Sequence, residues 1–230
     1  LQDNGSWCGP SRRKNGPVTS AMWATVAGGD GFVTAQDPTD PNIVYAESQG
    51  GNMARINLAT GERSALQKPQ WRPRYTQWED SILVERPDTT QPMTAAQKRR
   101  IEQFRARQRA DSAELDIRWN WNTPFFLSWH NPSVFYAAAN RVLKSNDRGN
   151  NLTFISPDLT TRDLKAIDVS LRKTGGVTPD LTGAETFSTI VSLNESPVRA
   201  GMLFAGTDDG KVWVTRTDGA SWEELTGRFP

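Results

Sequence analysis

Three segments of the chain repeat one arrangement: a short apolar strand, a polar turn that contains proline, and a second strand that ends in small residues. A third strand and a glycine-containing turn follow each copy. Proline suits the first turn because it fixes φ and cannot donate a hydrogen bond into a strand ladder, and glycine suits the hairpin ends. The copies cover residues 31–46, 125–137 and 189–206, with third strands at 54–57, 141–144 and 212–215.

A meander of this kind cannot bury both of its faces alone, so repeated copies are expected to stack, most commonly as the blades of a propeller. The fold class predicted is all-β: a partial or small β-propeller of antiparallel meander blades with a helical insertion. The alternative is a single β-sandwich, which the same strand and turn signals allow. The 9 Trp, 18 Gly and 14 Pro among 230 residues favour short strands and tight turns in either case.

Charge and the rarest residue types exclude several function classes. The net charge of +1 provides no global field for nucleic acid or an anionic membrane, so any basic feature must be local. One cysteine, Cys8, excludes an intrachain disulfide, and one histidine, His130, argues against a histidine metal site and against Ser-His or Cys-His catalysis. The sequence also contains no glycine-rich phosphate loop of the kind that binds nucleotides. Together with the single histidine, this leads us to expect neither a metal nor a cofactor. His130 lies in an inter-strand turn and is interpreted as structural.

The chain also lacks a run of 18 or more apolar residues, so no transmembrane segment is expected. It begins at Leu1 without a signal-peptide pattern, which fits a mature exported protein as well as a trimmed chain.

The predicted domains are residues 1–70 with the first blades, an insertion at 71–118, and 119–230 with further blades. Within the insertion, Thr94 and Gln97 form a capping-box pattern ahead of a basic helix at about 94–110, expected to run from Ala95 to Ala110. Its apolar stripe of Met93, Ile101 and Phe104 is too thin for a core helix.

The basic helix has two interpretations: a solvated insertion, or a docking element for an acidic partner, an anionic lipid surface or nucleic acid. The helix carries no interleaved aromatics, which argues against nucleic acid. Trp, Tyr and Arg contribute most of the binding energy in protein interfaces. The insertion also contains Trp71, Tyr75 and Trp78, which could bind a partner or could simply cover an open blade. The candidate partner-binding residues are Lys98, Arg99, Arg100, Arg105, Arg107, Arg109, Trp71, Tyr75 and Trp78.

Two turns match the Asp-box pattern S-x-D-x-G-x-T-W in part. Ser145, Asp147 and Gly149 fit the first, although Leu152 stands in place of the Trp; Gly219 and Trp222 fit the second, where Thr217 takes the Asp position and Asp218 follows it. The Asp accepts backbone N–H bonds across the hairpin and the Gly takes positive φ. Asp147 and Asp218 are therefore interpreted as structural rather than catalytic.

Beyond these turns, blocks at residues 2–7, 28–32, 45–52, 119–124, 155–160 and 205–210 resemble the bacterial sortilin-like, glycosyl-hydrolase-like propeller family with Asp-box (BNR) repeats. Members are usually exported and longer, so the resemblance implies a periplasmic or extracellular location. It also implies that this chain is a slice of about four blades or fewer. An open propeller exposes sheet edges, which a partner chain is expected to cover.

The predicted function is a non-catalytic scaffold or extrinsic subunit of a larger protein assembly, for example a membrane-bound photosynthetic one, with other protein chains as partners and no nucleic acid. The alternative is a fragment of a glycan-active hydrolase of the xyloglucanase-like class, which needs a carboxylate pair. Asp30 is the best candidate acid, followed by Asp37 and by Asp208 or Asp209. The structural alternative for Asp30 is a turn aspartate that caps its own loop. Peptide binding in a central channel is a third option and requires a complete ring.

Overall fold

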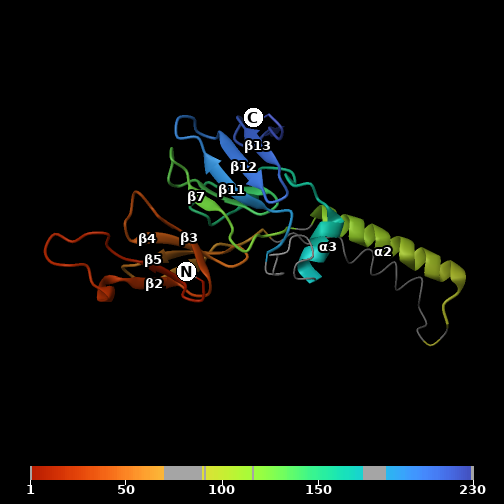
Figure 1. Cartoon of the computed structure of the whole chain (residues 1–230), viewed down its shortest axis with the longest axis horizontal. Helices are drawn as coiled ribbons and strands as arrows, with labels where there is room; N and C mark the ends of the chain where they lie inside the picture. The colour runs from red at the N-terminus through yellow and green to blue at the C-terminus, as the bar shows by residue number, and fades with distance from the viewer. Residues whose placement is uncertain (1, 70–89, 91, 116, 173–184, 229–230) are drawn as a thin grey trace. The chain divides into compact units, whose positions relative to one another are not determined.

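The structure is a computed structural model that describes residues 2–69, 90, 92–115, 117–172 and 185–228. The chain divides into two compact units, residues 1–69 with 118–230, and residues 70–117. The first unit contains all the strands of the described residues, and the second contains helix α2 (Figure 1).

The strands of the first unit form four antiparallel sheets, in each of which consecutive strands pair. A two-stranded sheet joins β1 (Ser6–Cys8) to β2 (Ala24–Ala27). Blade 1 consists of β3 (Gly31–Gln36), β4 (Ile43–Ser48), β5 (Asn52–Asn57) and β6 (Arg63–Ala65). Blade 2 consists of β7 (Phe125–Leu127), β8 (Phe135–Ala138), β9 (Val142–Ser145) and β10 (Thr153–Phe154). Blade 3 consists of β11 (Ile190–Glu195), β12 (Leu203–Thr207), β13 (Val212–Thr215) and β14 (Glu223–Glu224).

This arrangement confirms the predicted all-β class with the meanders of a partial propeller, rather than the two facing sheets of a sandwich. All nine strands expected from the repeat form, with ends that differ from the predicted ones by a few residues. Short outer strands β6, β10 and β14 complete the blades. The β1–β2 sheet and a second helix, α3 (Leu164–Arg172), were not predicted as elements. Asp163 begins that helix, because its carboxylate accepts the backbone N–H groups of Lys165 and Ala166, both at 3.0 Å.

Blade 1 is buried on both faces, which explains the almost continuous apolar run of β4. Val44 pairs with Ile56 on one face, and these side chains pack with Val26 of β2. On the opposite face, the Tyr45 ring lies 5.4 Å from the Phe135 ring of β8, centroid to centroid. Blade 1 therefore lies between the β1–β2 sheet and blade 2.

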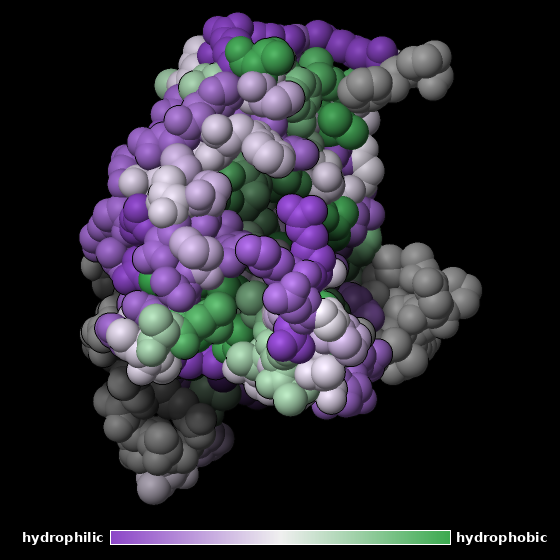
Figure 2. All heavy atoms as spheres, turned by 90° about the vertical axis from the view of Figure 1, so that its left-hand side faces the viewer, coloured by the Kyte–Doolittle hydropathy of each residue, from purple (hydrophilic) through white to green (hydrophobic). Residues whose placement is uncertain are grey.

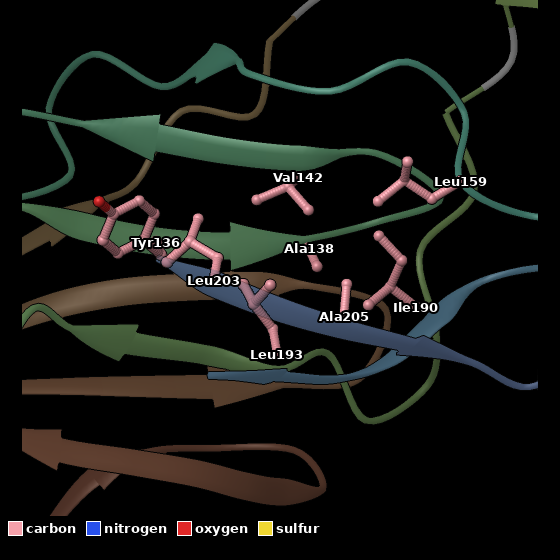
Figure 3. Packing of buried hydrophobic residues seen from close by; sticks show 8 residues of the cluster. All are labelled: Tyr136, Ala138, Val142, Leu159, Ile190, Leu193, Leu203 and Ala205. Atoms are coloured by element: carbon pink, nitrogen blue, oxygen red, sulfur yellow. The ribbon is translucent and has the colours of Figure 1, made fainter. Parts of the chain in front are cut away.

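Blades 2 and 3 share a cluster of eight buried apolar residues. Figure 3 shows its side chains between the ribbons of the two blades. Removal of this apolar surface from water provides the main driving force for stacking one blade on the next. The cluster consists of Tyr136, Ala138, Val142, Leu159, Ile190, Leu193, Leu203 and Ala205.

Helix α2 (Ala95–Leu115) of the second unit ends beyond the expected Ala110. At its start, the Thr94 N–H donates to Gln97 Oε1 at 3.0 Å and the Gln97 N–H donates to Thr94 Oγ1 at 3.2 Å, which is a reciprocal capping box. Ile101 is buried and Phe104 is half-buried. Neither this helix nor any other in the described ranges is long and apolar enough to span a membrane.

Candidate functional site

The turn of blade 2 at residues 145–152, which matches the Asp-box pattern in part and is called the Asp-box turn below for that reason, is closed by its own side chains. Ser145 Oγ accepts the N–H groups of Asp147 and Gly149, at 3.2 and 3.0 Å, and Asp147 Oδ1 accepts the Asn151 N–H at 2.9 Å. Hydrogen bonds from Ser145 and Asn151 lower the pKa of Asp147, so the carboxylate keeps its charge. Gly149 has a φ of 87°, which favours glycine.

The corresponding turn of blade 3 uses threonine. Thr215 Oγ1 accepts the Gly219 N–H at 3.0 Å, and Thr217 Oγ1 accepts the Ser221 N–H at 2.9 Å, so Thr217 performs the local role that Asp147 has in blade 2. Trp222 Nε1–H donates to the carbonyl of Ile155 in blade 2 at 2.9 Å, which places the closing aromatic between sheets.

Asp218 departs from the local role expected of an Asp-box residue, because its carboxylate leaves the turn and joins blade 3 to blade 2. Asp218 accepts the Tyr136 hydroxyl at 3.1 Å and forms an ion pair with Lys144 at 2.5 Å. Burial and the Asp218 charge both raise the pKa of Tyr136, which therefore stays protonated and donates.

Blade 2 contacts blade 1 through the same turn position. Arg148, which precedes Gly149 as Asp218 precedes Gly219, forms an ion pair with the buried Asp37 at 2.5 Å. The Tyr45 hydroxyl and Arg55 Nη1 donate to the Arg148 carbonyl, at 3.4 and 3.0 Å. Burial alone would raise the pKa of Asp37, but hydrogen bonds from Thr39 and the Arg148 charge outweigh burial and lower it.

The turn glycines approach the preceding blade closely. A Cβ at Gly149 would lie 2.8 Å from Leu66 Cδ1 of blade 1, and a Cβ at Gly219 would lie 2.6 Å from the Ile155 carbonyl oxygen of blade 2. Leu225 holds in blade 3 the position that Leu66 and Ile155 hold in blades 1 and 2. The backbone N–H groups of Leu66, Ile155 and Leu225 donate to the carbonyls of Met53, Val142 and Val212, respectively.

Phe204 of blade 3 occupies the position that Tyr45 and Tyr136 hold in blades 1 and 2. Tyr45 pairs with Arg55 across the strands, Tyr136 with Lys144, and Phe204 with Val214. Tyr45 and Tyr136 are covered by the next blade and are at most 2% exposed, whereas Phe204 is 40% exposed. Val191 on the neighbouring strand β11 is also exposed, at 44%. We call Val191, Phe204 and Leu225 the open blade face. It is a candidate docking site: these three side chains are apolar, and Asn194 and Glu223, which pair with Phe204 and Val214, lie on the same face.

Exposed apolar side chains also mark two linked turns, which precede β8 and β12. His130 Nε2 lies 2.9 Å from the Ser196 carbonyl oxygen, and Glu195 Oε2 accepts the Ser128 hydroxyl at 2.6 Å, so the turns are tied together. Trp129 and Val198 on these turns are 67% and 90% exposed. On the face drawn in Figure 2, hydrophobic residues gather in several areas, with hydrophilic residues between them.

The four aspartates considered as catalytic acids each accept hydrogen bonds from their own fold. Asp30 is buried and accepts the Asp3 N–H at 2.8 Å, so it fastens a neighbouring loop instead of capping its own. Asp37 is held as described above. Asp208 accepts the Thr189 N–H at 2.9 Å, and burial raises its pKa. Asp209 accepts the N–H and hydroxyl of Thr161, both at 2.8 Å.

A buried carboxylate that sequence reasoning missed lies between blades 1 and 2. Glu47 is 0% exposed, and its Oε1 accepts the N–H groups of Gly51 at 3.1 Å and Thr123 at 3.3 Å. Its Oε2 has no hydrogen-bond partner among the described residues. Burial raises the pKa of Glu47 to about 7, although the Lys68 charge opposes this shift. The sequence feature that could have identified Glu47 is the presence of an acidic residue within an apolar strand. Ala138 occupies the corresponding position in blade 2.

A buried ion pair between Arg118 and Asp158 was also missed. Arg118 Nη2 donates to Asp158 Oδ2 at 2.9 Å and Arg118 Nε donates to the Ser188 carbonyl at 3.1 Å, which ties the segment before blade 2 to the one before blade 3. Burial would raise the pKa of Asp158, but hydrogen bonds from Thr160 and the Arg118 charge lower it overall. The pair therefore remains ionised and structural.

A polar pocket of 370 Å³ lies between blade 1 and the Asp-box turn of blade 2. Its two guanidinium groups already serve the interface, because Arg55 donates to the Arg148 carbonyl and Arg148 pairs with Asp37. Within the described residues, no cluster of metal-ligating side chains is present here or elsewhere. The lining residues are Asp40, Ile43, Arg55, Asn57, Glu62, Ser64, Arg148 and Asn150.

The residues predicted to bind partners lie in the second unit. Lys98, Arg99, Arg100 and Arg105 are exposed on α2, and Arg100 takes part in an interaction there. The side chains of Arg107 and Arg109 lie outside the described part of the chain, as do Trp71, Tyr75 and Trp78.

Neither the protein-family models nor the curated proteins compared with this chain give a match. Among solved structures, the chain is similar to the GH74 xyloglucanase from Xanthomonas campestris, with 17% identity and a TM-score of 0.44. The similarity covers 87% of this chain and 21% of that one, so the chain spans about a fifth of the xyloglucanase's length. A similarity at this level carries no functional argument.

Proposed function

We propose that the chain is a non-catalytic, exported propeller module of the Asp-box (BNR, sortilin-like) kind that acts as a scaffold or extrinsic subunit in a larger protein assembly. The observation that carries this proposal is the open blade face. The surface that is covered by the next blade at Tyr45 and at Tyr136 is exposed and apolar at Phe204. Exposed aromatic and aliphatic groups of this kind form the centres of protein interfaces.

The carboxylates support the non-catalytic part of the proposal. A hydrolase of glycans needs two carboxyl groups that face a cleft and are available to the substrate. Asp30, Asp37, Asp208 and Asp209 instead accept hydrogen bonds from residues elsewhere in the fold, namely Asp3, Arg148, Thr189 and Thr161 in that order.

A photo-crosslinking amino acid placed at Phe204 tests the docking role in the source cell. The expected result is one adduct of defined mass whose partner is a protein. The matched control is the same crosslinker at Leu164, which is 50% exposed and belongs to α3, outside the strands of blade 3. Equal adduct patterns at both positions, or none at Phe204, contradict the docking role.

An activity screen on β-glucans tests the non-catalytic role. No hydrolysis by a well-folded sample is expected. Hydrolysis by the natural chain that is lost in Asp30→Asn, with folding retained, contradicts the proposal and supports an enzyme.

A further inference from the structure

The loop at residues 9–23, between β1 and β2, has no role in the packing described above. Its two strands pair directly, with Trp7 opposite Thr25 and Cys8 opposite Ala24. Connections between paired antiparallel strands usually contain about two to five residues. A connection this long within a compact unit is typical of a binding loop.

The loop carries a dense local positive charge. Arg12, Arg13 and Lys14 are consecutive and exposed, and residues 9–23 contain no Asp or Glu. None of the three forms an ion pair within the described ranges; Arg13 Nη1 donates to the Pro17 carbonyl at 3.4 Å. Without them, 24 basic and 26 acidic residues leave the rest of the chain at −2, so this patch is opposite in sign to the remainder.

Two exposed indoles lie at the base of the same loop. Continuing the strand register by one residue places Gly9 opposite Trp23, on the face that also carries Trp7. A Cβ at Gly9 would lie 2.5 Å from the Trp23 ring, so glycine lets that ring lie against the backbone of β1's end. Trp7 is 47% and Trp23 43% exposed, and Trp7 Nε1–H donates to the Asn4 carbonyl at 2.7 Å.

We propose that residues 7–23 form a peripheral membrane-docking element that binds an anionic lipid bilayer, with Arg12, Arg13 and Lys14 at the headgroups and Trp7 and Trp23 at the interface. Indoles combine an apolar body with a polar N–H and are enriched at the headgroup level of bilayers. Clustered cations are attracted to anionic lipid, and the attraction falls off within a Debye length.

Nucleic acid fits these residues less well than lipid. Duplex binding typically neutralises about six to ten phosphates, and three cations on one loop tip are too few. A lipid surface, in contrast, requires no shape complementarity beyond a projecting loop with cationic and interfacial groups.

The experiment is flotation of the full chain with vesicles of phosphatidylcholine alone or mixed two to one with phosphatidylglycerol. Wild type is expected to float with the mixed vesicles and to release at high salt. The triple variant Arg12→Glu, Arg13→Glu, Lys14→Glu is expected to lose roughly a hundredfold or more in vesicle affinity, given the usual contribution of each cation near such a surface. Trp23→Ala should lose affinity severalfold on the same vesicles, with the far-UV spectrum unchanged.

The matched control is Lys165→Glu, Arg199→Glu, Arg228→Glu, which makes the same change in charge at exposed positions outside the loop and outside α2. It is expected to retain binding within about threefold. Equal losses in the two triple variants, or no preference of wild type for the anionic vesicles, overturn the proposal. Binding of a labelled oligonucleotide that is lost in the loop variant, without vesicle binding, overturns it in favour of nucleic acid.

Discussion

At the scale of single residues, Glu47 is the clearest departure from an ordinary blade. A carboxylate that is 0% exposed, with one oxygen unpaired among the described residues, pays a large desolvation cost when it ionises. The neutral acid is less costly, which is why burial raises the pKa of Glu47 from 4.5 to about 7. Folding therefore favours the protonated form.

This shift predicts a pH dependence of stability. The Glu47 contribution is fully favourable below pH 4.5, is lost progressively as pH rises towards 7, and is absent above the folded pKa. Between these limits the free energy of unfolding of wild type should fall by roughly 3 kcal/mol relative to Glu47→Gln, which cannot ionise. Urea unfolding of both proteins at a series of pH values measures the difference. A constant difference across the range would contradict the inferred burial of the acid.

At the scale of elements, the Asp-box turn both closes a hairpin and docks one blade on another. The hairpin part is local, because Ser145, Asp147 and Gly149 bond to one another or to Asn151. The docking part is not local, because Gly149 meets Leu66 of blade 1. Gly61 in blade 1 has the local role without the docking role. Its φ of 74° is similar to that of Gly149, but a Cβ at Gly61 would meet nothing within 4 Å.

Alanine at the two glycines should therefore have different costs. Gly61→Ala suffers the left-handed backbone strain alone, about 1 kcal/mol, whereas Gly149→Ala adds a clash with Leu66 and should cost about 2–4 kcal/mol. Denaturant unfolding measures both variants under the same conditions. Equal costs would mean that the turn of blade 2 does not rest on Leu66.

At the scale of the whole molecule, the first unit is held together by links between blades that are distant in sequence. The Arg148–Asp37 pair joins blades 2 and 1, and the Tyr136–Asp218 and Lys144–Asp218 contacts join blades 2 and 3. Asp37 has a fully buried side chain, while that of Arg148 is 37% exposed. The pair is thus partly screened by solvent, and removal of Arg148 leaves a buried acid behind.

Arg148→Met should destabilise the folded chain by about 2 kcal/mol, less than for a fully buried pair because solvent screens the guanidinium. Asp37→Asn with Arg148→Met should cost less than the sum of the two single changes. A double-mutant cycle by urea unfolding gives the coupling energy. Additive costs would show that the two side chains do not interact in solution.

The sequence alone determined the repeated meander, the strand positions and the closure of the turn at Asp147, because these depend on residues close together in the chain. It also identified Thr94 and Gln97 as a capping box, for the same reason. It missed α3, although Asp163 was a local signal for its start.

Only the tertiary structure decided which charges meet and which surfaces remain open. Asp218 belonged to a turn by its sequence position, but stacking placed it against Tyr136 and Lys144 of another blade. Stacking likewise buried Glu47 and left Phe204 exposed at a position where two tyrosines are covered. Such outcomes depend on the packing of whole sheets across large sequence separations, and local propensity carries no information about that packing.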